Sequence, residues 1–247
     1  MSIQGALRRF ARREPTAPAR PGLESLTPAD RRIVECALPH TMTSVARIQA
    51  VIDAVRYCEQ RGIPGAFAEC GVWRGGSVLA MILALQELDA EPRDIHLYVT
   101  FEGMTRPGEE DGAALAGWLD TRDGHGRAWP ELFGSDVFDE QGVRRTLVAT
   151  GYPADRLHFV RGPVEETIPG HLPGALALLR LDTDWYESTR HELEHLYPLL
   201  ADGGVLIIDD YGHWEGARRA VDEYFASHAH PLLLNRIDYT GRVAIKH

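Results

Sequence analysis

Two largely apolar runs that stop at acidic residues constrain the fold of this chain most. Residues 175–181 and 205–208 each precede a pair of acids. This pattern is typical of buried parallel strands that deliver polar groups to the carboxyl edge of a sheet, where open α/β folds keep their sites. The acids are Asp182 and Asp184 after the first run, and Asp209 and Asp210 after the second.

Composition narrows the class of protein. The chain has 247 residues, 44% of them hydrophobic, which suits one α/β domain with a sizeable core. The formal net charge of -10 offers no electrostatic footprint for nucleic acid or an anionic membrane. No apolar run reaches the roughly 18 residues that span a bilayer. Three cysteines without paired spacing indicate neither a disulfide framework nor a zinc site, and we expect a cytoplasmic protein.

The first 61 residues precede the first expected strand. Residues 1–20 are rich in arginine and contain a single acid, so we interpret them as a frayed basic tail. Thr27 and Pro28 indicate an N-cap and the first residue of a helix. We expect residues 21–61 to form a helical lid over a site rather than part of the sheet.

Strand and helix patterns then alternate. Strands are expected at 66–70, 95–99, 157–160, 175–181 and 205–208, and helices at 78–88, 141–150, 188–200 and 215–227. Two β-like runs, 231–237 and 242–245, indicate a hairpin. The order predicts an α/β fold with a mostly parallel, seven-stranded sheet, helices on both faces and a C-terminal antiparallel hairpin.

The domain is expected to span residues 62–247. Within it the periodicity disappears over 103–136, where glycines, prolines and two tryptophans indicate a long loop or insert. If sequential strands are neighbours, the first, fourth and fifth strands lie side by side.

A glycine-rich turn follows the first expected strand. Gly71, Gly75 and Gly76 let the backbone approach a ligand, and amides at the next helix start favour an anionic group. Glu69 is placed to accept a hydrogen bond from an amino group, so a ligand with α-amino and α-carboxyl ends fits. The alternative is a tight turn beside a solvated glutamate. The spacing differs from the dinucleotide fingerprint, which disfavours a nicotinamide dehydrogenase.

The aspartates indicate a metal and base centre. If the two acid-tipped strands are neighbours, their ends lie about 5 Å apart and Asp182 faces Asp209. Carboxylates that close repel strongly, and a divalent cation with oxygen ligands removes the conflict. Asp184, expected on the same side of an extended segment, is placed beside the cation as a base. Solvated acids at strand ends are the alternative.

Other polar and aromatic residues allow two interpretations each. His213 serves as a second base or caps a helix at the surface. His191 and His195 have a metal-like spacing, but the interleaved Glu192 and Glu194 favour the solvated face of a helix. Trp185 frames an acceptor pocket or packs in the core.

Five segments together resemble the TylF/MycF family, the macrocin-type O-methyltransferases. These segments are PHTMTS at 39–44, GIPGAFAECGVWRGGS at 62–77, FEGM at 101–104, LRLDTDWYEST at 179–189 and GGVLIIDDYGHWEGARRAVDEYF at 203–225. The resemblance covers roughly residues 25–245. Members are class I enzymes that use S-adenosylmethionine and magnesium, so it implies a class I, Rossmann-like methyltransferase fold.

The resemblance also implies roles for individual residues. Asp182, Asp209 and Asp210 are expected to hold Mg²⁺, and Asp184 is expected to be the general base. The 69–77 segment and two lid residues are expected to surround the methionine part of the cofactor. The cofactor-binding residues implied are Thr41, Met42, Glu69, Gly71, Trp73, Gly75, Ser77, Thr100, Glu102 and Asp182.

Val99 departs from the family pattern. Family members usually place an aspartate before the FEG element, where it receives the ribose hydroxyls. The valine side chain accepts no hydrogen bond. Either Thr100 or Glu102 takes over the ribose contact, or cofactor affinity is weakened.

The activity implied is methyl transfer from S-adenosylmethionine to a hydroxyl of a small molecule, in particular a sugar hydroxyl of a glycosylated natural product. Two rivals remain: a catechol-type O-methyltransferase with a planar aromatic acceptor, and a non-catalytic cofactor-binding protein, which Val99 favours slightly. A homo-oligomer, dimer or tetramer, is also expected, without a nucleic-acid or membrane partner.

Overall fold

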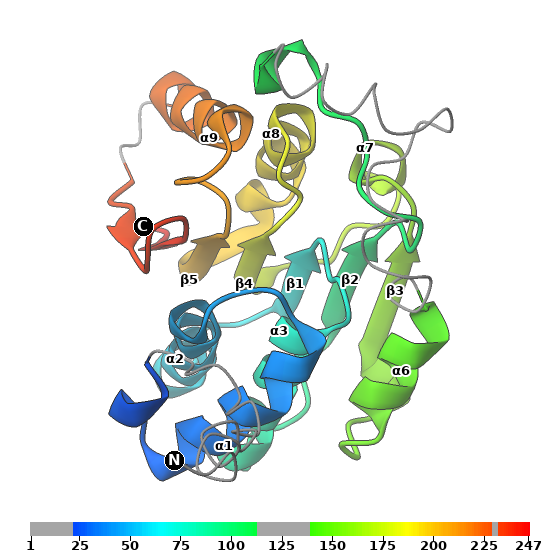
Figure 1. The fold of residues 1–247 in the computed structure, drawn as a ribbon, viewed down its shortest axis with the longest axis vertical. Helices are drawn as coiled ribbons and strands as arrows, with labels where there is room; N and C mark the ends of the chain where they lie inside the picture. The colour runs from blue at the N-terminus through cyan, green and yellow to red at the C-terminus, as the bar shows by residue number, and fades with distance from the viewer. Residues whose placement is uncertain (1–21, 113–138, 229–231) are drawn as a thin grey trace, which may run out of the picture.

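The computed structural model describes residues 22–112, 139–228 and 232–247. The expected basic tail and most of the expected 103–136 insert lie outside the described residues. The described residues form a twisted sheet between two layers of helices (Figure 1).

The sheet has seven strands in the order β3-β2-β1-β4-β5-β7-β6. Strands β1 to β5 pair in parallel, whereas β7 is antiparallel to both β5 and β6. The predicted fold class and the adjacency of β1, β4 and β5 are therefore confirmed. The strands are β1 Ala66–Cys70, β2 Ile95–Val99, β3 Leu157–Arg161, β4 Leu176–Leu181, β5 Leu200–Ile208, β6 Asn235–Arg236 and β7 Arg242–Ile245.

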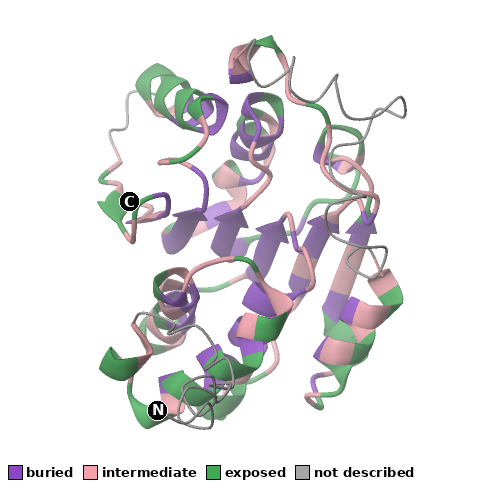
Figure 2. Cartoon of the chain, in the orientation of Figure 1, coloured by how far each residue is buried: buried purple, intermediate pink, exposed green. Residues whose placement is uncertain are grey.

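Alternate side chains of the strands pack against different helices. Phe67, Leu178 and Ile207 join a core with α1, α2, α3 and α6, whereas Leu179 and Ile208 join one with α7, α8 and α9. Helices cover both faces of the sheet, so β1 and β4 are buried along their whole length and are mostly apolar (Figure 2). The helices are α1 Pro28–Ala37, α2 Val45–Arg61, α3 Gly76–Glu87, α6 Glu140–Val148, α7 Val164–Thr167, α8 Tyr186–His195 and α9 Glu215–Ser227.

Local signals account for most element boundaries. The Thr27 side chain accepts a hydrogen bond from the Asp30 amide at the start of α1, as expected of an N-cap. Gly62 ends α2 in the left-handed conformation, with φ of 61°. Short 3-10 turns occur at Leu23–Ser25, Leu38–His40, Glu109–Asp111, Ala154–Arg156 and Tyr197–Leu199.

Three expected boundaries are wrong. Helix α8 ends at His195 instead of residue 200, because Pro198 cannot donate to a continuing helix, and the chain makes a 3-10 turn. Strand β5 begins at Leu200 although its Asp-Gly-Gly sequence resembles a turn; the β4–β5 register shifts there. The first hairpin strand shortens to Asn235–Arg236.

The N-terminal helices are part of the layered core. Helices α1 and α2 pack against α3, and α2 also contacts β4 and β5. Of the expected lid, residues 41–43 and Arg47 in the first turn of α2 line the cavity at the carboxyl edge of the sheet. The lid role stays a prediction.

Two expectations from composition can be compared with the structure. The three cysteines, all within the described residues, are free. None of the described helices combines the length and the apolar character that a bilayer crossing needs.

Candidate active site

A cavity of about 510 Å³ opens at the carboxyl edge of the parallel strands. The loops that follow β1, β2, β4 and β5 line it, together with residues 41–43 and the turn before β7. Sites of open α/β sheets lie at this edge, and the volume is in the range of small-molecule sites.

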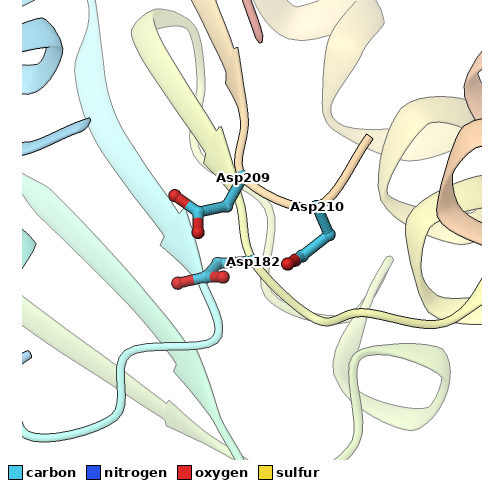
Figure 3. Close-up of side chains that lie close together, drawn as sticks. All are labelled: Asp182, Asp209 and Asp210. Carbon is cyan, nitrogen blue, oxygen red and sulfur yellow. The ribbon is translucent and has the colours of Figure 1, made fainter. Parts of the chain in front are cut away.

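Three aspartates converge on this cavity from two neighbouring strands. Leu181 of β4 lies opposite Ile208 of β5, so the residues that follow them emerge side by side. Asp182, Asp209 and Asp210 each offer a carboxylate oxygen within 4.8 Å of the others. Figure 3 shows the three carboxylates facing a common space. The expected juxtaposition of Asp182 and Asp209 is thus confirmed.

Two arginines, neither expected from the sequence as a site residue, balance part of this negative charge. Arg180 of β4, 1% exposed, donates to Asp182 at 2.7 Å and also to Glu69 and Asp209. Arg47 of α2 donates to Asp209 on its other side. One buried guanidinium therefore joins Glu69 at the end of β1 to the aspartates after β4 and β5.

The remaining carboxylates are still crowded. Burial raises the pKa of Asp182 to about 6 against the opposing effect of Arg180. Burial, with the nearby charge of Asp182, raises the pKa of Asp184 to about 7. Burial and the charge of Asp184 raise the pKa of Asp210 well above its usual value. A cation among these oxygens would relieve the repulsion and keep the ligands ionised.

Asp184 reaches the cavity through an unusual backbone conformation. Its φ is 70°, so the segment after Asp182 is not extended, as the sequence suggested, but turns sharply. The side chain still lines the same cavity, and Trp214 donates from its indole nitrogen to Oδ1 at 2.6 Å. The indole fixes one carboxylate oxygen.

The expected amino-group acceptor, Glu69, lies at the end of β1 and is 1% exposed. Its Oε1 accepts a hydrogen bond from Arg180, whereas its buried Oε2 has no partner among the described residues. Burial raises the pKa of Glu69 to about 8, and the Arg180 charge opposes this shift. A ligand ammonium at Oε2 would supply the missing donor.

The first residues of the glycine turn line the cavity, whereas its last residues pack at the start of α3. Gly71 has φ of 81°, and a Cβ there would overlap the carbonyl oxygen of Asp182, so this turn requires glycine. Trp73 also lines the cavity, with φ of 51°. Gly75 and Ser77 do not line it; they begin α3, where Gly75 approaches α6 and Ser77 is buried.

The two candidates for ribose contact differ in position. Thr100 lines the cavity, but its hydroxyl donates to the carbonyl of Gly103 at 2.6 Å. Glu102 lies outside the cavity lining and accepts from Arg161 at 3.2 Å. Thr100 is therefore the better placed of the two, although this hydroxyl already has a partner.

The remaining predicted residues also have defined positions. Thr41 and Met42 line the cavity from loop 38–44, and Met42 is 62% exposed. His213 lines it too, and its Nδ1 lies 2.5 Å from the Tyr239 hydroxyl. Trp185, by contrast, is 2% exposed and packs at 5.3 Å from the Trp214 ring, so core packing is the correct alternative.

The expectation that Glu192 lies on a solvated face of helix α8 is wrong. Glu192 is fully buried and accepts from the Thr183 hydroxyl at 2.9 Å, so it supports the loop between Asp182 and Asp184. His191 and His195 lie outside the cavity, and His191 contacts the Ile168 carbonyl. Because Glu192 lies between two histidines in the sequence, nothing in the sequence pattern indicated that its side chain is buried.

The donor chemistry fits both groups that the family resemblance implies. Three carboxylates form an all-oxygen set of the kind that Mg²⁺ prefers, and the buried Oδ2 of Asp210 has no partner among the described residues. The buried Oε2 of Glu69 likewise fits the amino end of a methionine-type cofactor.

Sheet order, terminal antiparallel hairpin and cavity position together define a class I methyltransferase fold. The structure of the O-methyltransferase NovP matches it with a TM-score of 0.72 and 30% identity, covering 84% of this chain and 82% of that one. The model of the family described as macrocin-O-methyltransferase (TylF) matches residues 25–246. This chain belongs to that family and is an O-methyltransferase.

Two curated relatives agree with this assignment. The 8-demethyl-8-(2,3-dimethoxy-alpha-L-rhamnosyl)-tetracenomycin-C 4'-O-methyltransferase of Streptomyces olivaceus is 34% identical over 209 residues, 83% of this chain and 75% of the relative. The demethyldecarbamoylnovobiocin O-methyltransferase of Streptomyces niveus is 33% identical over 187 residues, 76% of this chain and 68% of the relative.

Proposed function

We propose that this enzyme transfers the methyl group of S-adenosylmethionine to a sugar hydroxyl of a glycosylated natural product and that it requires Mg²⁺. The observation that carries the proposal is the meeting of three aspartates and a separate aspartate in one cavity, next to the glycine turn. The name of the Streptomyces olivaceus relative, whose acceptor carries a rhamnosyl group, supports a sugar acceptor.

Each residue has a stated part in this proposal. Asp182, Asp209 and Asp210 would hold Mg²⁺, and Glu69 would bind the cofactor's amino group. When bound, Mg²⁺ lowers the pKa of the acceptor hydroxyl and the cofactor supplies an electrophilic methyl group. Asp184 would receive the proton of the acceptor hydroxyl as that oxygen takes the methyl group, and the cofactor would leave as S-adenosylhomocysteine.

The position of Asp184 suits the role of general base. It lies two residues from Asp182 on the same loop, its side chain lines the cavity, and its Oδ1 is held by Trp214. Proton transfer to a positioned carboxylate is worth about 10² to 10⁴ in rate.

An acceptor panel tests the proposal. The purified enzyme is incubated with methyl-labelled S-adenosylmethionine and either rhamnosides with vicinal hydroxyls or catechols, with Mg²⁺ or with EDTA. We expect label in the rhamnosides only, and only with Mg²⁺. Transfer to catechols alone would favour the aromatic acceptor class, and transfer in EDTA would contradict the metal requirement.

A further inference from the structure

We propose that Arg47 is an internal counter-ion of Asp209 and gives up this carboxylate when a divalent cation binds. The inference rests on the proposed function, because it concerns the same metal site. It adds a residue that competes with the metal and so sets its affinity.

Both carboxylate oxygens of Asp209 are already engaged by guanidinium groups. Arg180 donates from Nη2 to Oδ1, and Arg47 donates from Nη1 to Oδ2. Thr43 adds a contact to Oδ1 at 3.4 Å. A cation that uses either oxygen must therefore share it with an arginine or displace one.

Arg180 is the arginine that stays. Its side chain is 1% exposed, and the same guanidinium also binds Glu69 and Asp182. Withdrawal would leave a buried charge and three carboxylates without their common partner, which is strongly unfavourable.

Arg47 is the arginine that can leave. Its side chain is 15% exposed at the cavity wall. It also has a second carboxylate partner, because Nε donates to Asp238 at 3.1 Å, and Ser44 donates to the same Asp238 oxygen at 2.6 Å. The guanidinium can therefore release Asp209 and remain paired with Asp238.

An independent observation indicates that the cluster is incomplete without a ligand. The Oδ2 of Asp210 is buried and has no partner among the described residues, and Asp210 is one of the three aspartates that each offer a carboxylate oxygen within 4.8 Å of the others. A divalent cation would satisfy this oxygen and outcompete the single charge of Arg47 at Asp209.

The release of Asp209 by Arg47 would link cation binding to two segments of the cavity wall, the start of α2 and the turn before β7. Arg47 lies in the first turn of α2, which follows loop 38–44, and Asp238 lies in the turn before β7, next to Tyr239. The Arg47–Asp209 contact thus fastens both segments to the end of β5. Cation binding removes this one contact, whereas the Thr240 hydroxyl still donates to the Asp209 carbonyl and the Arg47–Asp238 contact keeps the two segments together.

The test is calorimetric titration of Mg²⁺ into the whole protein at constant ionic strength. Arg47→Met removes the charge but keeps an unbranched stem, and we expect it to bind Mg²⁺ about tenfold more tightly than the wild type. The matched control is Arg56→Met, because Arg56 lies on the same helix and also bridges two carboxylates, Asp30 at 2.6 Å and Glu87 at 3.1 Å. This control should bind Mg²⁺ like the wild type.

A second comparison tests the route through Asp238. Asp238→Asn removes the alternative partner of Arg47, so Mg²⁺ should bind less tightly than to the wild type. In the Arg47→Met background the same substitution should have a smaller effect, because the residue that Asp238 restrains is gone. Equal effects in both backgrounds would contradict the inference.

The outcomes separate this inference from the proposed function. Equal or weaker Mg²⁺ binding by Arg47→Met overturns the inference but leaves the metal site intact. Absence of Mg²⁺ binding by all variants and the wild type overturns the metal site itself, and the inference with it. If Arg47→Met melts at a lower temperature than the wild type, Arg47→Gln provides the same charge removal, and its affinity decides.

Discussion

At the scale of the residue, Asp184 concentrates the chemistry. Its left-handed backbone, φ of 70°, costs a non-glycine residue on the order of 1 kcal/mol, and the surrounding structure must stabilise it. Trp214 contributes through its hydrogen bond, and Glu192 contributes by holding Thr183. The proposed base is thus held in place before an acceptor arrives, which would limit the loss of entropy at the reaction step.

Replacement of Asp184 tests its role. Asp184→Asn keeps the side-chain shape and an oxygen that Trp214 can contact, but it cannot take up the acceptor proton. We expect turnover to fall by about 10² to 10⁴, while calorimetry shows S-adenosylhomocysteine binding within about threefold of the wild type. Near-normal turnover would remove Asp184 from the role of base.

Replacement of Gly71 tests the close contact between the glycine turn after β1 and the backbone of Asp182 after β4. Gly71→Ala places a residue with a side chain at a positive φ, and its Cβ would overlap the Asp182 carbonyl. We therefore expect the free energy of unfolding to fall by at least about 2 kcal/mol. Gly62→Ala is the control, because its φ is also positive but nothing lies within 4 Å of a Cβ there. Urea denaturation should give about 1 kcal/mol for this control, and equal losses would contradict the packing argument.

Site residues differed in how far the sequence predicted them. The four aspartates were predictable because each follows an apolar strand, and strand ends meet at one edge. Arg180 was not, since an arginine inside an apolar run resembles a residue at a solvated edge. Its role became visible only when β1, β4 and β5 placed Glu69, Asp182 and Asp209 around it.

At the scale of the element, the strands position the site and the loops supply its walls. The parallel pairing of β4 with β5 places the acids side by side, and this arrangement was predictable from hydrophobic patterning together with the tendency of sequential strands to be neighbours. Loop details were less predictable. The sharp turn at Asp184 and the start of β5 at Leu200 depend on tertiary contacts rather than on local propensity.

Strands β2 and β3 carry a pair of histidines that makes stability depend on pH. His96 stacks on His158 at 4.6 Å, and burial, with the charge of His158, lowers the pKa of His96 to about 4. Protonation therefore favours the unfolded chain, where the pKa is near 6.5. The contribution of His96 is fully present above pH 6.5 and is lost as pH falls toward 4, by at most about 2 kcal/mol for a partly exposed ring.

Equilibrium denaturation at several pH values checks this expectation. His96→Gln should lose less stability than the wild type between pH 6.5 and 4. His247→Gln, at an exposed position, should follow the wild type. Parallel pH profiles for His96→Gln and the wild type would show that His96 has no such role.

At the scale of the whole molecule, the fold brings distant segments to one cavity. Loop 38–44, the glycine turn after β1, the acids after β4 and β5, and the turn before β7 meet within it, although nearly 200 residues separate the first from the last. The formal net charge of -10 adds a field that favours a divalent cation over an anionic partner. The expected dimer or tetramer stays a prediction for this family member.

The central claim, a metal held by the three aspartates, is tested most directly by crystals of the protein with S-adenosylhomocysteine and Mn²⁺, which occupies oxygen sites of the Mg²⁺ type. Anomalous scattering then locates the ion. We predict one strong peak between Asp182, Asp209 and Asp210, and its disappearance in Asp209→Asn. An empty space between these carboxylates, with the peak at another position, would contradict the claim.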